Sequence, residues 1–356
     1  MHIAIGYRWF ASAAGYHLER ALRDLDHTVT YVGLPAEGRP GYDNAIDLGA
    51  ILATMPQPPE FYLWIDPAGR YFPPGIEDLP VPTAAYLIDV HLGHWRQLAA
   101  RFFDAVFVAQ KDYVDGFRRV AGHDQVHWLP LAAAQDVHRQ WDLPRIYEVG
   151  FVGNMARAHR GTPRARRLKA TADRFRTNDF SRVYMPEEVG QVYSQSHIIF
   201  NSGIAGDVTM RIFEGTACGA LMLTDSTANG LRDLFEVGRE IAVYHDDADL
   251  IRQIEYYLAH PEERVRIAQA GQARTQREHL YTHRAQSIVD RVSDPSFRRA
   301  ASMRDASLET RAHARREIYT HLHMLDALLD EARAKGYGPL RRAWAAWPCL
   351  FRRLIV

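Results

Sequence analysis

The segment FNSGIAGDVTMRIFEGTACGALMLTD, residues 200–225, decides the fold of this chain. An apolar run at 197–200 leads into it and predicts a buried strand, which ends in the small polar residues that begin at Asn201. A helical pattern follows, and a second apolar run at 220–223 predicts the next strand. Strand, loop, helix and strand in this order place polar groups at the carboxyl edge of a parallel sheet, where open α/β sheets bind ligands.

Length and composition favour a two-domain globular protein. The 356 residues exceed the usual size of one domain, and 47% of them are hydrophobic and 24% charged. Lys and Arg together number 43, as do Asp and Glu, so the balance argues against a protein that coats nucleic acid. The two cysteines, Cys218 and Cys349, stand far apart and predict neither a disulfide framework nor a metal site.

The sequence favours a cytoplasmic location. Its first residues, MHIAIGYRWF, lack the cationic start and apolar core of a signal peptide. No stretch reaches the roughly 18 consecutive apolar residues that a membrane span needs. A reducing compartment is therefore the expectation.

Strand-like runs alternate with helical patterns along most of the chain. This alternation predicts an α/β fold of two doubly wound, Rossmann-like domains that face a cleft, with helices at the C-terminal end. We predict an N-terminal domain at 1–140, a second domain at 146–295 and a helical extension at 296–356. Strands are predicted at 2–5, 28–32, 61–65, 83–88, 105–109 and 126–131, and then at 149–152, 181–184, 197–200, 220–223 and 241–244.

Four motifs of the second half carry a family resemblance. They are YEVGFVGN (147–154), VTMRIFEGTACGALMLTD (208–225), LFEVGREIAVYHD (234–246) and PEERVRIAQAGQARTQREHLYTHR (261–284). In order and spacing they resemble the glycosyltransferases of GT-B fold, in particular the spore-maturation CgeB-like group, which is glycosyltransferase family 1-like. The first half fits chiefly through YLIDVH (86–91) and WLPLA (128–132).

The resemblance implies a glycosyltransferase. Its second domain would hold a nucleotide-diphosphate-sugar donor, and its first would hold an acceptor: a glycan, lipid, peptide or small molecule. It also implies no obligatory metal or other cofactor, because this fold neutralises the leaving diphosphate with helix ends and basic side chains. Two alternatives stay open: a sugar-nucleotide epimerase or phosphorylase on the same fold, and a non-catalytic protein that binds the nucleotide sugar.

The donor's phosphates are expected near two loops. Gly153 and Asn154 follow a strand, so their backbone N–H groups can approach a phosphate closely. Arg211 begins the helix after the small-residue loop and is the predicted cation, with a surface ion pair to Glu214 as the alternative. Thr209 is a candidate to cap this helix and to donate its hydroxyl to a phosphate, and the two roles are compatible.

Further donor contacts follow from the resemblance. Glu214 matches the carboxylate that accepts hydrogen bonds from the ribose hydroxyls. Asp207 stands where retaining relatives carry an acidic residue near the sugar, but its side chain is one carbon shorter, which leaves the stereochemistry open. Tyr184 and Met185 are predicted beside the base, and Asn201 belongs to the same donor-binding set.

The acceptor hydroxyl needs a base near the cleft. Asp89 follows the strand YLI and is the leading candidate if the reaction inverts the anomeric centre. His91 and His94 come next in the same loop. His17, near the start of the first helix, is the alternative base, although most of the 17 histidines are expected to be structural.

Two basic segments have competing interpretations. The Arg-rich stretch 155–176 is favoured as a solvated helix face, and Arg157 and Arg160 are its best candidates for phosphate contact. The tail PLRRAWAAWPCLFRRLIV (339–356) is favoured to pack on the body, with weak contact to an anionic membrane surface as the alternative.

Overall fold

The computed structural model describes residues 1–66, 69–153, 162–225 and 228–334, and this part of the chain divides into two compact units. The first unit comprises residues 1–109, 113–129 and those from 285 onward, and the second comprises 110–112 and 130–284. The domain limits at 140, 146 and 296 stay a prediction.

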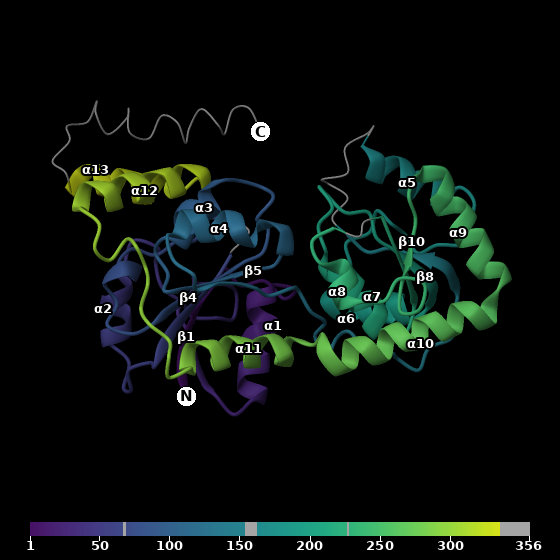
Figure 1. The fold of residues 1–356 in the computed structure, drawn as a ribbon, viewed down its shortest axis with the longest axis horizontal. Coiled ribbons are helices and arrows are strands. Elements are labelled where there is room, and N and C mark those ends of the chain that lie inside the picture. The colour runs from purple at the N-terminus through teal and green to yellow at the C-terminus, as the bar shows by residue number, and fades with distance from the viewer. Residues whose placement is uncertain (67–68, 154–161, 226–227, 335–356) are drawn as a thin grey trace. The chain divides into compact units, whose positions relative to one another are not determined.

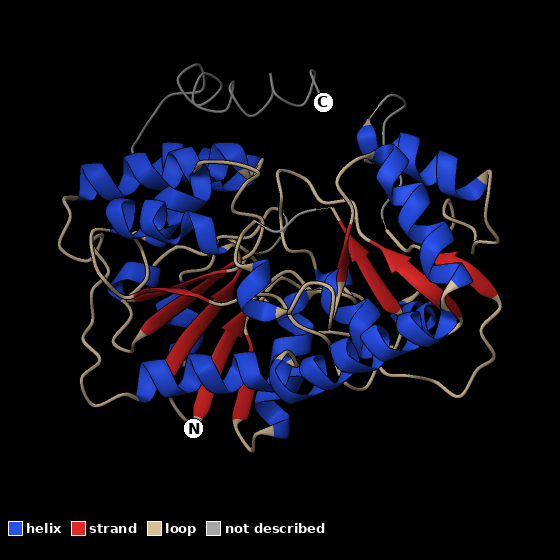
Figure 2. Cartoon of the chain, turned by 45° about the vertical axis from the view of Figure 1, so that its right-hand side comes forward, coloured by secondary structure: helices blue, strands red, loops and turns tan. Residues whose placement is uncertain are grey.

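Within the described residues, the first unit contains a six-stranded parallel sheet in the order β2-β1-β3-β4-β5-β6. Every residue of β3, β4 and β5 is buried, as expected for strands that helices cover on both faces (Figure 2). The strands are β1 (His2–Gly6), β2 (Thr28–Tyr31), β3 (Phe61–Ile65), β4 (Thr83–Leu87), β5 (Ala105–Val108) and β6 (Val126–Trp128). The helices are α1 (Ala14–Asp24), α2 (Leu48–Ala53), η1 (Ile76–Asp78), α3 (Trp95–Ala100), α4 (Val114–Ala121), α12 (Leu308–His321) and α13 (Leu325–Ala334).

Asp104 fastens the C-terminal segment to the first sheet. Its fully buried carboxylate accepts hydrogen bonds from the backbone N–H groups of Ala300 and Ala301, at 2.9 and 3.0 Å, and from Arg304 at 2.8 Å. Burial alone would raise the pKa of Asp104, but the bonds from Ala301 and Arg304 outweigh it and lower the pKa. Beyond this anchor, α12 packs against α3 and α13 (Figure 1).

The described part of the second unit contains a four-stranded parallel sheet in the order β10-β9-β8-β7. Its strands are β7 (Tyr147–Gly150), β8 (Ser196–Phe200), β9 (Leu221–Thr224) and β10 (Ala242–Val243). Its helices are α5 (Pro163–Ala172), α6 (Pro186–Ser194), α7 (Met210–Ala217), α8 (Leu231–Leu234), α9 (Asp247–Ala259) and α10 (Pro261–Glu278). Two further helices, η2 (Lys111–Tyr113) and α11 (Tyr281–Ser293), each span a limit between the units.

The strand predicted at 181–184 is wrong. The Asp179 carboxylate accepts hydrogen bonds from the N–H and the hydroxyl of Ser181, at 2.8 and 2.6 Å, which closes a local turn. Val183 is 88% exposed, so this segment has no buried face for a sheet. The predicted α/β class with two parallel sheets is confirmed, and so is the order of strand, loop, helix and strand across β8, α7 and β9.

Candidate functional site

Polar residues gather at the carboxyl edge of the second unit's sheet. There the chain leaves β7 at Phe151, β8 at Asn201 and β9 at Asp225. Because these strands are parallel neighbours, the loops that follow them lie together. The site is therefore described from this edge.

Arg211 lies in the first turn of α7 and reaches across this edge. Its Nε and Nη2 donate to the carbonyl of Val152, at 3.1 and 3.0 Å, and its guanidinium lies over the Phe151 ring, 4.0 Å from the centroid. Gly153 makes this placement sterically feasible, since a Cβ there would lie 2.8 Å from Nη2. The guanidinium is thus held against the loop that follows β7.

Asn201 is completely buried and organises its neighbours. Its Oδ1 accepts hydrogen bonds from Arg211 at 2.7 Å and from the Thr209 hydroxyl at 2.9 Å, while its Nδ2 donates to Thr224. Thr209 occupies the N-cap position of α7, but its side chain makes no capping hydrogen bond, so the prediction that Thr209 caps this helix is wrong. Asn201 and Thr209 fix the position of the arginine.

Two arginines of α5 also reach this edge, which sequence reasoning missed. Arg164 donates to the carbonyl of Ser202 at 3.1 and 2.7 Å, and burial followed by the nearby Arg211 lowers the pKa of Arg164. Arg167 is held by Asp225 at 2.7 Å and by Asp247 at 2.8 Å. The expectation of a solvated helix face is wrong for both residues. Their i, i+3 spacing after a helix start indicated that both side chains lie on the same face of the helix.

The loop between β8 and α7 is closed by two carboxylates. Asp207 accepts from the N–H of Ile204 at 2.5 Å, and Asp225 accepts from the N–H of Gly203 at 3.0 and 3.2 Å. Ala205 and Gly206 have φ angles of 53° and 74°, so the loop turns through the left-handed region. Both carboxylates lie near the space that a Cβ on Gly203 would occupy.

Glu214 lies one turn after Arg211 and faces the interior. Burial raises the pKa of Glu214 to about 7, although Arg211 opposes the shift. Its Oε1 lies 3.5 Å from Nε2 of the buried His138, and burial lowers the pKa of that histidine to about 4. Because Nδ1 of His138 accepts from the N–H of Ala134 at 3.1 Å, the neutral ring carries its proton on Nε2, towards Glu214.

Tyr184 is linked to this edge through Asn178, whose Nδ2 donates to the Tyr184 hydroxyl at 3.2 Å and whose amide bonds both the N–H and the carbonyl of Phe151. Tyr184 bonds through its hydroxyl to the carbonyl of Asp179 at 3.0 Å, and Met185, the N-cap residue of α6, is 59% exposed. Asn154 and Arg157, together with Arg160 and the tail at 339–356, lie outside the described residues.

In the first unit, Asp89 follows β4 in a loop that a buried ion pair holds. Asp66, directly after β3, accepts from the backbone N–H groups of Ile88 and Asp89, both at 3.2 Å. Its carboxylate is paired with Arg96 of α3, at 2.5 and 3.1 Å, and both side chains are nearly inaccessible to solvent. Sequence reasoning missed this pair, which fixes the backbone of the predicted base.

The histidines considered as bases occupy different environments. His17 lies in α1 and is only 3% exposed, whereas His91 is half-buried and His94 is exposed at the N-cap of α3.

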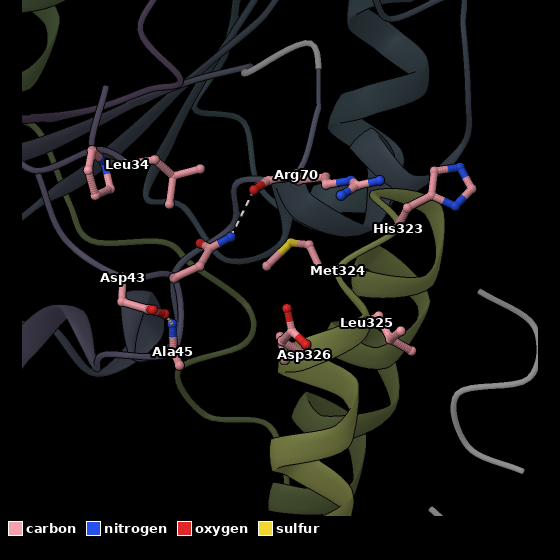
Figure 3. Close-up of a pocket in the computed structure, with 11 residues that line it drawn as sticks. Leu34, Asp43, Ala45, Arg70, His323, Met324, Leu325 and Asp326 are labelled. Carbon is pink, nitrogen blue, oxygen red and sulfur yellow. Dashed lines mark hydrogen bonds between the residues drawn. The ribbon is translucent and has the colours of Figure 1, made fainter. Parts of the chain in front are cut away.

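A pocket of about 630 Å³ beside the loops after β2 and β3 is lined by residues that include Leu34, Arg70 and Asp326 (Figure 3). Neither Asp89 nor His17 is among its lining residues.

Two absences can be stated for the part of the chain that the structure describes. No cluster of three or more His, Cys, Asp or Glu side chains there is arranged to hold a metal ion. None of its helices combines the length and apolarity that crossing a membrane requires.

Comparison with known proteins finds a family match for residues 151–290 and a similar fold for most of the chain. Residues 151–290 match the family model described as glycosyl transferase-like, whereas no curated protein matches the chain. A glycosyltransferase from Rickettsia africae ESF-5 has a similar structure, with a TM-score of 0.59 and 11% identity over 83% of this chain and 99% of that one. Anabaena Alr3699/HepE, in complex with UDP and glucose, has a TM-score of 0.57 and 12% sequence identity, over 82% of this chain and 99% of that one. A candidate UDP-N-acetylglucosamine 2-epimerase from Listeria monocytogenes has a TM-score of 0.53 and 12% sequence identity, over 82% of this chain and 95% of that one. The predicted resemblance is thus confirmed: residues 151–290 are similar to the glycosyl transferase-like family, and the chain has a GT-B-like fold.

Proposed function

We propose that this protein transfers a sugar from a nucleotide-diphosphate-sugar donor to an acceptor hydroxyl. The observation that carries the proposal is the pair of arginines at the carboxyl edge of a glycosyl transferase-like domain. Arg164 and Arg211 are neighbours there, and among the described residues both bind backbone carbonyl or amide oxygens and form no ion pair with a carboxylate. Two such cations suit a pyrophosphate.

The arginines would stabilise the charge that develops on the leaving diphosphate. Donors held in place before the reaction need no reorganisation as that charge builds, which lowers the barrier. Arg211 is fixed by Val152, Asn201 and the Phe151 ring, so its guanidinium is already oriented. The N–H groups of Gly153 and Asn154, with Arg157, complete the proposed phosphate site.

The nucleoside and the sugar would lie on either side of the phosphates. Glu214 is the proposed acceptor for the ribose hydroxyls, with Tyr184 and the exposed Met185 beside the base. Asp207, in the loop after β8, and Asp225, directly after β9, both bond the backbone of the loop after β8, and carboxylates there can accept hydrogen bonds from sugar hydroxyls. Asn201 and Thr209 would act by positioning Arg211.

A donor screen tests the proposed function. The similar Anabaena protein HepE has a crystal structure in complex with UDP-glucose, so uridine nucleotides come first, followed by the other nucleoside diphosphates and their sugars. We expect one nucleotide series to raise the midpoint of thermal unfolding, because a ligand at 100 times its Kd stabilises the folded state by about 2.7 kcal/mol. The stabilising sugar nucleotide should then be consumed, by transfer or by hydrolysis.

The screen also discriminates between the alternatives. Binding without transfer or hydrolysis would indicate a non-catalytic binding protein. Conversion to an epimeric sugar nucleotide would indicate an epimerase. If no nucleoside diphosphate or its sugar shifts the midpoint, the proposal is wrong.

Asp89 is the proposed general base, with His17 as the weaker alternative because it is almost entirely buried. Replacing Asp89 with Asn should lower kcat at least tenfold, since a positioned base typically contributes 100-fold or more. Asp124→Asn is the matched control, because that side chain is fully exposed in the same unit. Unchanged transfer by a folded D89N enzyme would remove Asp89 as base.

A further inference from the structure

A second, cationic pocket lies at the opposite edge of the second unit's sheet. It encloses about 270 Å³ and is lined by residues at or before the amino ends of β7, β8 and β9, namely Arg145, His197 and Gly219, and by one face of α10. Three glutamines, Gln140, Gln269 and Gln272, complete a polar wall. No carboxylate is among the lining residues.

Arg145 is fixed at the floor of this pocket. Its Nη1 donates to the carbonyl of Ser196, and its Nη2 donates to the carbonyl of Gly219 at 2.5 Å. These two carbonyls belong to the amino ends of neighbouring strands, so the guanidinium bridges them. A guanidinium carries five N–H donors, and these two bonds use two of them.

Arg264 of α10 supplies the second guanidinium. It is 8% exposed, donates to the carbonyl of Tyr257 at 2.8 Å and lies 3.4 Å from Nδ1 of His197. Burial lowers the pKa of Arg264, and burial followed by Arg264 lowers the pKa of Arg145. The two cations therefore repel each other in a poorly solvated place.

No acid compensates these charges. Within the described residues, neither Arg145 nor Arg264 forms an ion pair with a carboxylate, although buried charges in proteins are normally paired. Glu148 lies near His197, but it accepts from the backbone N–H of Arg176 at 2.7 Å and does not line the pocket. Burial, then Arg264 and Arg145, lowers the pKa of His197 to about 4, so the ring is neutral at physiological pH.

We propose that this pocket binds a small phosphate-bearing anion, distinct from the donor. Two fixed guanidiniums match the several acceptor oxygens of a phosphate, and amide N–H groups from the glutamines add neutral donors. The volume exceeds that of a phosphate group, since a water molecule takes about 30 Å³, so the pocket has room for a small organic part. The ligand is a phosphate monoester or inorganic phosphate.

The experiment places a carboxylate in the pocket of the full-length protein. Gln269→Glu is on the exposed rim of α10, and Gln276→Glu makes the same charge change on the same helix away from the pocket. Thermal unfolding and calorimetry are measured with inorganic phosphate and with glycerol phosphate, against chloride at matched ionic strength. Arg211→Ala reports any phosphate that binds at the donor site instead.

We expect phosphate to bind the wild type, Q276E and R211A alike, and to bind Q269E at least tenfold more weakly. Q269E should also unfold at a higher temperature in phosphate-free buffer, because its carboxylate neutralises the arginines. Tighter binding of glycerol phosphate than of inorganic phosphate would assign the ligand as an ester, and the reverse would assign free phosphate. Binding lost in R211A but kept in Q269E, or no binding to the wild type, would overturn the proposal.

Discussion

Replacing Glu214 with glutamine is expected to stabilise the folded protein above pH 7. It is also expected to weaken donor binding about 100-fold, because one charge-assisted hydrogen bond, of roughly 2–3 kcal/mol, is lost. Burial raises the pKa of Glu214 from 4.5 to about 7. The native state therefore keeps a proton that the unfolded chain releases near pH 4.5. Glutamine has the same shape and carries no charge to bury.

The sign of the pH effect follows from proton binding. Between about pH 4.5 and 7 the native state binds more protons than the unfolded state, so the free energy of unfolding falls as the pH rises through this window. The total loss is up to roughly 3 kcal/mol and is complete above pH 7. E214Q avoids this loss, so its advantage should be small at pH 5 and full at pH 8.

Denaturant unfolding at pH 5 and pH 8 measures the effect, with Glu255→Gln on an exposed position of α9 as the matched control. Calorimetry with the donor found in the screen measures its Kd. Because the ribose hydroxyls need the charged carboxylate, binding by the wild type should release a proton near pH 6.5. Equal stability of E214Q and wild type at pH 8 would contradict the buried carboxylate, and unchanged donor affinity would contradict its role.

The second large effect is expected at Arg211. Arg211→Ala should lower kcat/KM by about 100- to 1,000-fold, the cost of removing one preorganised donor to developing charge. Arg211→Lys should recover little of this loss, because an ammonium cannot span the Val152 carbonyl and the Asn201 amide at once. Both variants should fold, since Arg211 is not part of either sheet.

Steady-state kinetics with donor and acceptor, or with donor hydrolysis alone, give the measurement. Arg174→Ala is the matched control, as that arginine is exposed in the same unit. A loss confined to kcat would assign Arg211 to the leaving diphosphate in the transition state, and a rise in KM alone would assign it to ground-state binding. Full activity of a folded R211A enzyme would remove it from the site.

The sequence predicted the order of elements around the proposed donor site well and its supporting contacts poorly. The order of elements from β8 to β9 and the place of Arg211 at a helix start follow from local periodicity, which one chain segment contains. The contacts of Arg164 with Ser202, and of Asp66 with Arg96, join residues about 30 or more positions apart. No local pattern encodes such partners.

The error at 181–184 has a similar origin. Val183 and Tyr184 have high strand propensity, but Asp179 bonds the backbone of Ser181 and turns the chain before a ladder can form. The sequence did not predict the roles of Arg164 and Arg167 for a different reason. Charge runs are solvated in most proteins, and only the folded structure shows that Arg164 contacts Ser202 after β8 and that Arg167 contacts Asp225 after β9.

The missing side chain at Gly153 has a consequence for redesign of this protein. A methyl group at position 153 would lie 2.8 Å from Nη2 of Arg211 and 2.9 Å from the Phe151 ring, so any larger residue there shifts the guanidinium from its place. Libraries intended to change the preferred nucleotide should leave position 153 constant. They should instead randomise positions such as 185, where the methionine side chain is open to solvent and new shapes can be accommodated.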